Sequence, residues 1–297
     1  MEQRGRVIAL GFFDGVHLGH GALLRRASER AAELGAVPAA LTFDAHPEAV
    51  ILGRGAPLLT TPAERTDLMR RLYGVEEVIV VRFDEAMRCM DWRDFVTDLL
   101  IGRYRAVHLI AGHDFRFGYG GEGNGSHLKA LCAEKGISCD IIPPVTLDGI
   151  TVSSTCIRTL VAQGELERAN EFLGHPWQLT GQVGHGKKLG SRLGFPTVNL
   201  RIPPDGVTPA FGVYAAKVWV GERSYIAVTN IGVRPTVDTG GAVTVEGFLL
   251  DFDGDLYGRD LRMEFYRHIR SERKFESLDA LRTQVMADAE TVRQYFF

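Results

Sequence analysis

Residues 7–34 restrict the fold of this chain more than any other segment, because they follow the order strand, glycine-rich turn and helix. An apolar run at 7–10 leads into Gly11-Phe12-Phe13-Asp14-Gly15-Val16-His17-Leu18-Gly19-His20, and a helical pattern covers 22–34. The glycines allow the backbone to approach a ligand closely, and the first amides of a helix are unpaired donors that carry about half a positive charge. This order predicts a phosphate-binding site where the first strand ends.

Two histidines within this segment carry the candidate chemistry. His17 and His20 are three residues apart, so in a first helical turn both imidazoles face one side and can donate hydrogen bonds to a phosphorus centre under attack. A metal site or a helix cap would also use two histidines, but no cysteine or glutamate adjoins them and the spacing is not that of HExxH. We therefore interpret the segment as a nucleotide site. Its turn consists of Gly11, Phe13, Asp14 and Gly15.

Composition excludes several classes of protein. The chain has 297 residues, enough for two domains, and a formal net charge of -3. Its pI near 6.3 does not favour a general nucleic-acid-binding surface. Its apolar runs are far too short to span a membrane, and its four cysteines have no CxxC spacing and read as free thiols. Because no cleavage pattern follows the basic N-terminal segment, we expect a cytoplasmic protein without a signal peptide.

The first half of the chain alternates between short apolar runs and helical patterns. Candidate strands lie at 7–12, 38–43, 78–82, 106–111 and 140–143. Helical patterns at 61–72 and 91–101 lie between them. Strands separated by helices predict an α/β fold with a parallel, Rossmann-like sheet that binds its ligands at the C-terminal ends of the strands.

The pattern changes after Pro143-Pro144. A helical stretch at 154–172 leads to Gly174-His175-Pro176, which reads as a linker. Short strand-like runs with turn residues follow at 178–183, 213–220, 225–229, 244–252 and 260–265. This spacing predicts a small antiparallel β-barrel closed by an amphipathic helix at 278–295. We expect one domain at 1–174 and a second at 175–297.

Three polar groups follow predicted strands of the first half. Asp44 ends the second strand, Asp114 ends the fourth, and Ser153-Ser154-Thr155-Cys156-Ile157-Arg158 opens the helix after the fifth. Each alone could be a helix cap or a turn. Together they converge on one edge of the predicted sheet, as a ligand site requires.

These motifs resemble those of the bifunctional bacterial riboflavin kinase and FAD synthetase family over almost the whole chain. The first half contains GxFDGxHxGH, TFDxHP, GxDFRFG and SSTxIR, which are similar to the family's adenylyltransferase motifs. The second half contains Gly194-Phe195-Pro196-Thr197-Val198-Asn199-Leu200, which looks like the kinase signature GFPTAN. Further similar segments are 212–214, 229–236 and 249–252. Two signature sets in the family's order make a strong match.

The resemblance implies two reactions. In the kinase half, a riboflavin hydroxyl attacks the γ-phosphate of ATP, with Mg²⁺ as cofactor. By resemblance, Thr197 and Asn199 hold magnesium and phosphate, and Glu246 is the base. The phosphate loop would include Gly186, Lys187, Gly190, Gly194 and Pro196.

In the other half, the resemblance implies that the FMN phosphate attacks the α-phosphate of a second ATP and expels pyrophosphate. This step needs no base, because the nucleophile is already ionised. The negative charge on the oxygens around the α-phosphorus would be neutralised by His17, His20 and Arg158. The remaining nucleotide-binding residues implied by the resemblance are Asp44, Asp114, Ser154 and Thr155.

The chain departs from the family pattern at several positions. Ser191 stands where arginine is common, Val198 where alanine is common, and Phe248 where histidine or tyrosine is usual. The loop at 120–123 is less basic than usual, and His113 is an unusual neighbour for Asp114. These departures leave the efficiency of the kinase open.

Two other functions remain as alternatives: a cytidylyl or pantetheine-phosphate adenylyl enzyme, and a non-catalytic flavin or nucleotide sensor. The second signature set argues against the first, and the intact candidate catalytic residues argue against the second. A GxGxxG match at 118–123, a near-Walker loop at 181–188 and a calcium-like run at 251–255 read as coincidences, the last as a hairpin turn. The sequence leaves open whether copies of the chain form a homo-oligomer, how the two sites communicate and which step limits flux.

Overall fold

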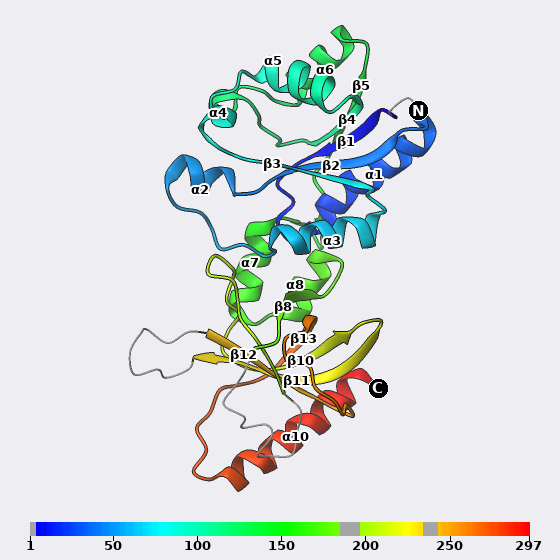
Figure 1. Ribbon diagram of the computed structural model, residues 1–297. Coiled ribbons are helices and arrows are strands. Elements are labelled where there is room, and N and C mark those ends of the chain that lie inside the picture. Colours follow the sequence, from blue (N-terminus) through cyan, green and yellow to red (C-terminus); the bar gives the residue numbers. More distant parts are fainter. Residues whose placement is uncertain (1–3, 185–196, 234–242) are drawn as a thin grey trace. The chain divides into compact units, whose positions relative to one another are not determined.

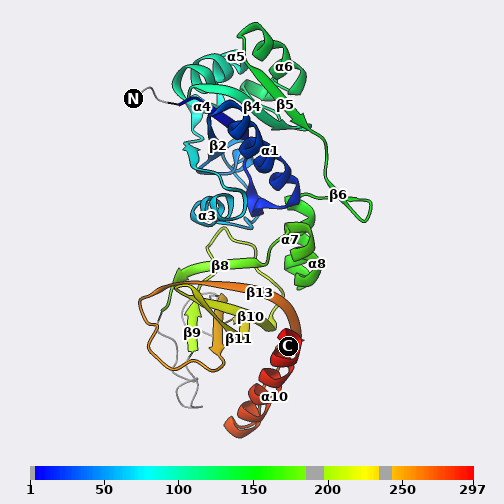
Figure 2. The ribbon, with the colours of Figure 1, turned by 90° about the vertical axis from the view of Figure 1, so that its right-hand side faces the viewer.

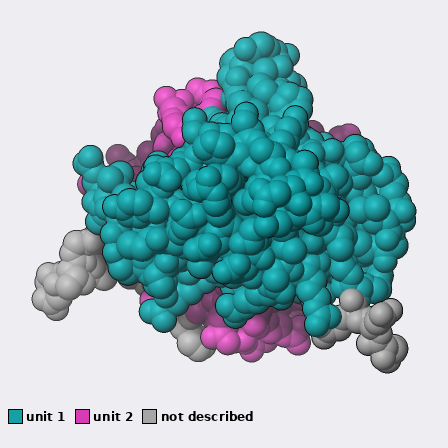
Figure 3. Space-filling view, turned by 90° about the horizontal axis from the view of Figure 1, so that it is seen from above, with its two compact units in different colours: residues 1–56, 62–153 teal, residues 57–61, 154–297 magenta. Residues whose placement is uncertain are grey.

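The computed structural model describes residues 4–184, 197–233 and 243–297. The chain divides into two compact units, shown as a ribbon in Figure 1 and coloured separately in Figure 3. The first unit comprises residues 1–56 and 62–153, and the second comprises 57–61 and 154–297. Five predicted phosphate-loop residues and Ser191 lie outside the described residues. The five are Gly186, Lys187, Gly190, Gly194 and Pro196.

The first unit is built on a five-stranded sheet in the order β3-β2-β1-β4-β5. Its strands are β1 (Arg6–Leu10), β2 (Val37–Phe43), β3 (Glu77–Val81), β4 (Ala106–Gly112) and β5 (Ser138–Ile142). All neighbouring pairs are parallel, which confirms the predicted parallel sheet. The strand order reverses between β1 and β4, and parallel sheets bind ligands beyond the C-terminal ends of strands at such a point.

Helices cover both faces of this sheet, as Figure 1 shows. The first face packs against α1 (Leu18–Leu34) and α3 (Pro62–Tyr73), and the second against η2 (Phe95–Arg103) and α6 (Gly125–Glu134). Successive residues of a strand point to opposite faces, so Val7 packs in the first core and Ile8 in the second. Burial on both faces explains why the strands are continuous apolar runs.

Several short elements connect these layers. They are η1 (Asp14–Val16), α2 (Pro47–Leu52), α4 (Glu85–Arg88), α5 (Trp92–Asp94), η3 (Tyr119–Gly121) and a hairpin of β6 (Thr146–Leu147) and β7 (Ile150–Thr151). The helix predicted at 91–101 is α5 followed by the π-helix η2, which is irregular in a way that apolar periodicity does not reveal.

The second unit contains a curled antiparallel sheet in the order β8-β13-β10-β11-β12-β9. Its strands are β8 (Trp177–Gln182), β9 (Thr197–Leu200), β10 (Gly212–Val220), β11 (Arg223–Val233), β12 (Val243–Leu249) and β13 (Asp260–Ser271). The N–H of Gly184 donates to the carbonyl of Asn199 at 3.0 Å, which brings the two ends of the sheet together. The result is a half-barrel, in agreement with the predicted small antiparallel barrel (Figure 2).

A long C-terminal helix, α10 (Leu278–Phe296), packs on this sheet (Figure 2). Ser277 caps its first turn by accepting a hydrogen bond from the N–H of Ala280 at 3.1 Å. This helix matches the one predicted at 278–295. In the part of the chain that the structure describes, no helix is long and apolar enough to cross a membrane.

The helix predicted at 154–172 is two helices, α7 (Ser154–Gln163) and α8 (Leu166–Leu173). Gly164 separates them with a φ of 81°, a left-handed conformation that favours glycine. Asn170 holds α8 on the half-barrel, because its side chain donates to the carbonyl of Phe265 at 2.8 Å and accepts from the N–H of Trp177 at 2.7 Å.

The hairpin predicted at Asp253-Gly254 is wrong. These residues lie between β12 and β13, which are not neighbours in the sheet. The local turn residues indicated a turn correctly, but pairing between strands depends on the whole sheet.

Candidate active sites

The turn after β1 adopts a strained backbone. Phe13, Gly15 and Val16 have φ values of 59°, 79° and 44°, all in the left-handed region. This conformation is rare for phenylalanine and rarer for a β-branched residue, and each such residue costs about 1–3 kcal/mol. Burial of Phe13 and Val16 in the core beside α1 holds the turn in place. Such strain concentrates at ligand sites, which agrees with the predicted phosphate-binding turn.

The two histidines lie side by side at the start of α1. His17 is the N-cap, and its Nδ1 accepts a hydrogen bond from the N–H of His20 at 3.3 Å. A neutral His17 therefore carries its proton on Nε2. The two rings stack with centroids 3.6 Å apart and planes 14° from parallel. The structure thus brings together the imidazoles that the sequence predicted to act together.

Burial lowers the pKa of His20 well below its ordinary value, and electrostatic interactions with His17 and Arg65 lower it further. The imidazole of His20 is therefore neutral near pH 7. A neutral imidazole can still donate one hydrogen bond.

Arg65 is a residue of this site that sequence reasoning missed. It is buried on α3, donates to the carbonyl of Phe12 at 2.7 Å and to Thr42 Oγ1 at 3.2 Å, and lies 4.1 Å from the centre of the Phe12 ring. A signal exists in the sequence. Arg65 occupies the helical stripe that continues with Leu68 and Met69, where a core-facing side chain is expected.

The two predicted aspartates lie at the same edge of the sheet but have different surroundings. Asp44 follows β2, and its Oδ1 accepts from the N–H of Phe83 at 2.9 Å, which ties together the ends of β2 and β3. Asp114 follows β4 and is 82% exposed, with His113 Nδ1 3.9 Å from its Oδ1. Asp44 thus has a structural contact, whereas Asp114 extends into solvent.

The third predicted group opens α7 in the second unit. Arg158 Nη1 donates to Thr155 Oγ1 at 3.4 Å, one turn earlier on the same helix. Ser154 is the first residue of α7. Val152, two residues before α7, lies near the start of α1 within the first unit. Its carbonyl oxygen is 3.7 Å from where a Cβ on Gly19 would stand. The role of Arg158 at the phosphate stays a prediction.

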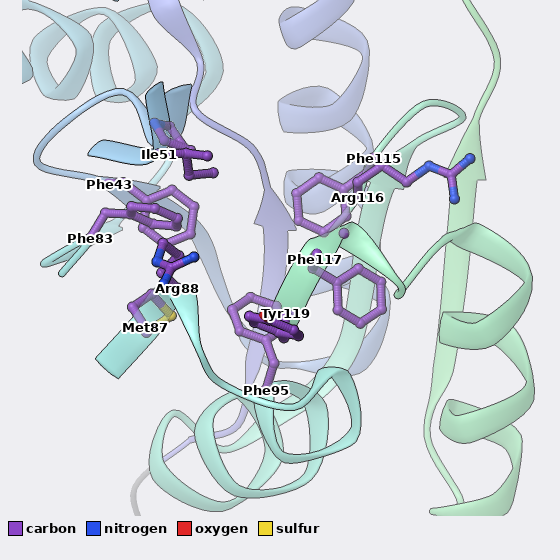
Figure 4. A pocket seen from close by; sticks show the side chains of 14 residues that line it. Phe43, Ile51, Phe83, Met87, Arg88, Phe95, Phe115, Arg116, Phe117 and Tyr119 are labelled. Atoms are coloured by element: carbon purple, nitrogen blue, oxygen red, sulfur yellow. The ribbon is translucent and has the colours of Figure 1, made fainter. Parts of the chain in front are cut away.

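An apolar cavity of about 420 Å³ opens near the C-terminal ends of β2, β3 and β4. Aromatic side chains dominate its walls: Phe43, Phe83, Phe95, Phe115, Phe117 and Tyr119. Figure 4 shows their rings arriving from separate elements, whereas the side chain of Arg116 extends away from them. Sequence reasoning missed this cavity, although Phe43 ends one predicted strand and Phe83 directly follows another.

The glycine-rich match at 118–123 forms part of this cavity. Gly118, Gly120 and Gly121 line it, and all three have positive φ values. A Cβ on Gly118 would stand 2.5 Å from Cα of Trp92, so the backbone approaches that residue too closely for a side chain. The segment is therefore part of the cavity wall.

The second candidate site is a row of polar side chains across three strands of the half-barrel. Glu246 on β12 pairs with Asn199 on β9 and with Asn230 on β11. Thr197 pairs with Phe248, two residues along the same face. Paired residues have Cβ atoms about 4.5–5.5 Å apart, so the predicted kinase residues lie together.

A cavity of about 270 Å³ adjoins this row, between the sheet and α10. We call it the kinase-side cavity. Thr197, Glu246 and Phe248 line it. Phe248, which stands where the family usually has histidine or tyrosine, is therefore part of the cavity wall. Val198 is buried on the opposite face, so the departure at 198 belongs to the barrel core. Further lining residues, none predicted from sequence, include Asn230, Arg270, Glu272, Arg273, Phe275 and Asp288.

The donor set of this row suits a hard cation. Thr197, Asn199 and Glu246 offer a hydroxyl, an amide oxygen and a carboxylate, the oxygen ligands that Mg²⁺ prefers. Among the described residues, no group of three or more His, Cys, Asp or Glu side chains could hold a metal ion.

Comparison with known proteins identifies the family of both halves of the chain. Residues 1–156 match the family model described as FAD synthetase, and residues 173–296 match the model described as riboflavin kinase. Three relatives are described as bifunctional riboflavin kinase/FMN adenylyltransferase. The Listeria monocytogenes protein is 36% identical over 98% of this chain and 92% of its own length. The Escherichia coli K12 protein is 37% identical over 99% and 94%, and the Bacillus subtilis protein 36% over 99% and 94%.

A solved structure has the same fold throughout. It is described as a macrolide-efflux protein from Streptococcus pneumoniae, and it is 30% identical with a TM-score of 0.85. The match covers 99% of this chain and 95% of that chain.

Proposed function

The chain belongs to the bifunctional riboflavin kinase/FMN adenylyltransferase family, and from this premise we propose how its residues divide the two reactions. The protein phosphorylates riboflavin to FMN and adenylylates FMN to FAD, using ATP in both steps. The observation that carries the assignment is the match of two family models to separate halves of the chain. We propose that residues 1–174 form the adenylyltransferase domain and residues 175–297 the kinase domain.

In the adenylyltransferase, the turn after β1 and the start of α1 bind the phosphates of ATP. The FMN phosphate attacks the α-phosphorus, the bond to the β-phosphate oxygen breaks, and pyrophosphate leaves. His17 donates a hydrogen bond from Nε2, and His20 donates one as a neutral imidazole. Both hydrogen bonds stabilise the negative charge that develops on the α-phosphate. The first amides of α1 add positive potential, and the part of Arg158 in this step is proposed from the family resemblance alone. Asp114, being exposed, remains available to position the nucleotide.

The aromatic cavity of the first unit suits the flavin ring of FMN. Planar aromatic ligands stack on aromatic side chains, and an apolar cavity at the C-terminal ends of parallel strands is a usual ligand site. Phe43, Phe117 and Tyr119 would contact the ring. Asp44 holds the ends of β2 and β3 at this cavity and would position the nucleotide through them.

In the kinase, Glu246 accepts the proton of the riboflavin hydroxyl while its oxygen attacks the γ-phosphorus of ATP and ADP leaves. Asn199 and Asn230 flank Glu246 in the sheet, and the side chain of Asn230 donates to Glu272 Oε1 at 3.3 Å. Thr197 and Asn199 would hold Mg²⁺, which neutralises charge on the phosphates. The phosphate loop at 186–196 belongs to this proposal through the family resemblance. Because both reactions consume ATP and a flavin, we expect the protein in the cytoplasm.

The test is direct. Purified protein with riboflavin and MgATP should yield both FMN and FAD on chromatography. His17→Ala and His20→Ala should each lower FAD formation from FMN by roughly a hundredfold, the usual effect of deleting one transition-state donor. Riboflavin phosphorylation should stay near the wild-type rate. Equal loss of both activities would show that these histidines support the fold instead.

A further inference from the structure

The kinase-side cavity has two walls of different construction. Strands β9, β11 and β12 form one wall, and their backbone hydrogen bonds fix its side chains. The other wall comes from residues 272–275 and the first half of α10, including Leu281 and Val285. The second half of α10 packs on the sheet through Ala289 and Val292. Leu281 and Val285 of the first half line the cavity and do not belong to this apolar cluster.

Arg270 and Asp288 form an ion pair between β13 and α10. Arg270 on β13 donates from Nε to both carboxylate oxygens of Asp288 on α10, at 3.0 and 3.2 Å. It also donates from Nη2 to Oδ2 at 2.8 Å. The Asp288 side chain is only 4% exposed and that of Arg270 is 21% exposed. A planar guanidinium bound to a carboxylate through two nitrogens fixes both distance and orientation.

Neighbouring side chains extend this contact along the second wall. Gln284 Nε2 donates to Asp288 Oδ1 at 2.7 Å, and Arg273 in turn donates to Gln284. Arg273 lies 4.7 Å from the centre of the Phe275 ring. One network thus joins β13, the segment at 272–275 and α10. Arg270, Arg273, Phe275 and Asp288 all line the cavity.

Stability alone is a weak explanation for this pair. Desolvation of two charges offsets much of their attraction, so apolar side chains of similar size often stabilise a fold equally well. A bidentate ion pair differs from apolar packing in that its hydrogen bonds are directional. A buried, bidentate pair at the edge of a cavity is therefore suited to setting the width of that cavity.

We propose that Arg270 and Asp288 are positioning residues for riboflavin phosphorylation. They hold α10 at the distance from the sheet at which the flavin fits between the two walls. They act through the lining side chains Phe275, Leu281 and Val285 and do not touch the reacting atoms. This inference rests on the proposed function of the kinase-side cavity.

The test replaces the pair by apolar side chains of similar length. The double variant Arg270→Met with Asp288→Leu leaves no buried charge unpaired, whereas either single variant would. The KM for riboflavin should rise about tenfold or more, while kcat stays within about threefold, because the strand wall that carries Glu246 is unchanged. FAD formation from FMN, measured on the same preparation, should stay at the wild-type rate and shows that the rest of the chain is intact.

A matched control lies on the same helix. Arg293 Nη2 donates to Asp251 Oδ1 at 2.7 Å, and these side chains are 43% and 79% exposed and do not line the cavity. The double variant Arg293→Gln with Asp251→Asn should keep the wild-type KM for riboflavin. An intermediate rise in KM is expected for Gln284→Ala, which leaves the ion pair in place.

Three outcomes would overturn the inference: a wild-type KM in the Arg270/Asp288 double variant, a fall in kcat at unchanged KM, or an equal rise in KM in the control pair. The last would mean that any loosening of α10 has this effect. Absence of FMN formation by the wild-type protein would instead contradict the proposed function itself, so the two failures are distinguishable.

Discussion

At the scale of single residues, the proposed roles give the two sites different protonation chemistry. The proposed adenylyltransferase site presents donors, because the phosphate nucleophile needs no base. Its His20 is kept neutral by burial and by the neighbouring charge of Arg65. The proposed kinase site needs an acceptor, because a hydroxyl must lose its proton, and Glu246 lies between two asparagines in the sheet.

Glu246→Gln tests the acceptor. Glutamine keeps the shape and hydrogen-bonding reach of glutamate but cannot accept a proton at neutral pH. FMN formation should fall roughly 10²–10⁴-fold, the usual contribution of general-base catalysis. FAD formation from supplied FMN should not change. Near-wild-type phosphorylation in this variant would leave Glu246 as an ordinary strand carboxylate.

The lowered pKa of His20 predicts a pH dependence of stability. In the unfolded chain this imidazole binds a proton below about pH 6.5, whereas in the folded protein it resists protonation to lower pH. The unfolded state therefore binds more protons, and the free energy of unfolding falls as the pH drops below about 6.5. Urea unfolding between pH 5 and pH 8 should show a shallower dependence for His20→Gln than for wild type. Identical slopes would mean that His20 titrates normally in the folded protein.

At the scale of elements, loops after strand ends build the proposed adenylyltransferase site. The turn after β1 is the proposed phosphate site, and the loop after β4 supplies a wall of the aromatic cavity. Both rely on left-handed backbone conformations held by packing. Their shape is therefore set by what they pack against, which for the second loop is Trp92.

Gly118→Ala tests this loop. Its φ of 74° disfavours a side chain, and the added Cβ would meet the backbone of Trp92 at 2.5 Å. The KM for FMN in adenylylation should rise about tenfold or more, with riboflavin phosphorylation unaffected. Gly120→Ala is the matched control, because its φ is also positive at 61° but nothing lies within 4 Å of the added Cβ. Equal effects of the two substitutions would point to backbone strain alone.

At the scale of the whole molecule, the two signature sets follow the two compact units except for SSTxIR, which opens α7 in the second unit. The helices α7 and α8 group with the half-barrel, and Asn170 bonds to both β8 and β13. Phe172 and Leu173 of α8 are also buried. The half-barrel therefore includes packing partners that lie before Trp177 in sequence.

Two fragments, which differ by the presence of α7 and α8, separate the contribution of these helices from that of the half-barrel. A fragment of residues 177–297 should phosphorylate riboflavin and make no FAD from FMN, because it lacks the first unit. A fragment of residues 154–297 should do the same with a higher midpoint of thermal unfolding, because it keeps α8 and the two Asn170 hydrogen bonds. FAD synthesis by either fragment, or a lower midpoint for the longer one, would contradict this division.

Much of this protein could be predicted from residues close together in the chain. The apolar runs predicted the parallel strands and the half-barrel, and the spacing of His17 and His20 predicted their proximity, because all these signals arise within one element or one turn. Sequence reasoning also placed Thr197, Asn199 and Glu246 in one site through family motifs, and the strand register brings them together.

Tertiary structure alone decided which distant side chains complete the sites. Arg65 reaches the phosphate turn from α3, the aromatic cavity gathers side chains from several elements, and Asp288 meets Arg270 only because α10 packs on the half-barrel. Periodicity shows which face of an element is buried, but not which partner covers it. Those contacts depend on how separate elements pack, so their geometry becomes defined only when the whole unit has folded.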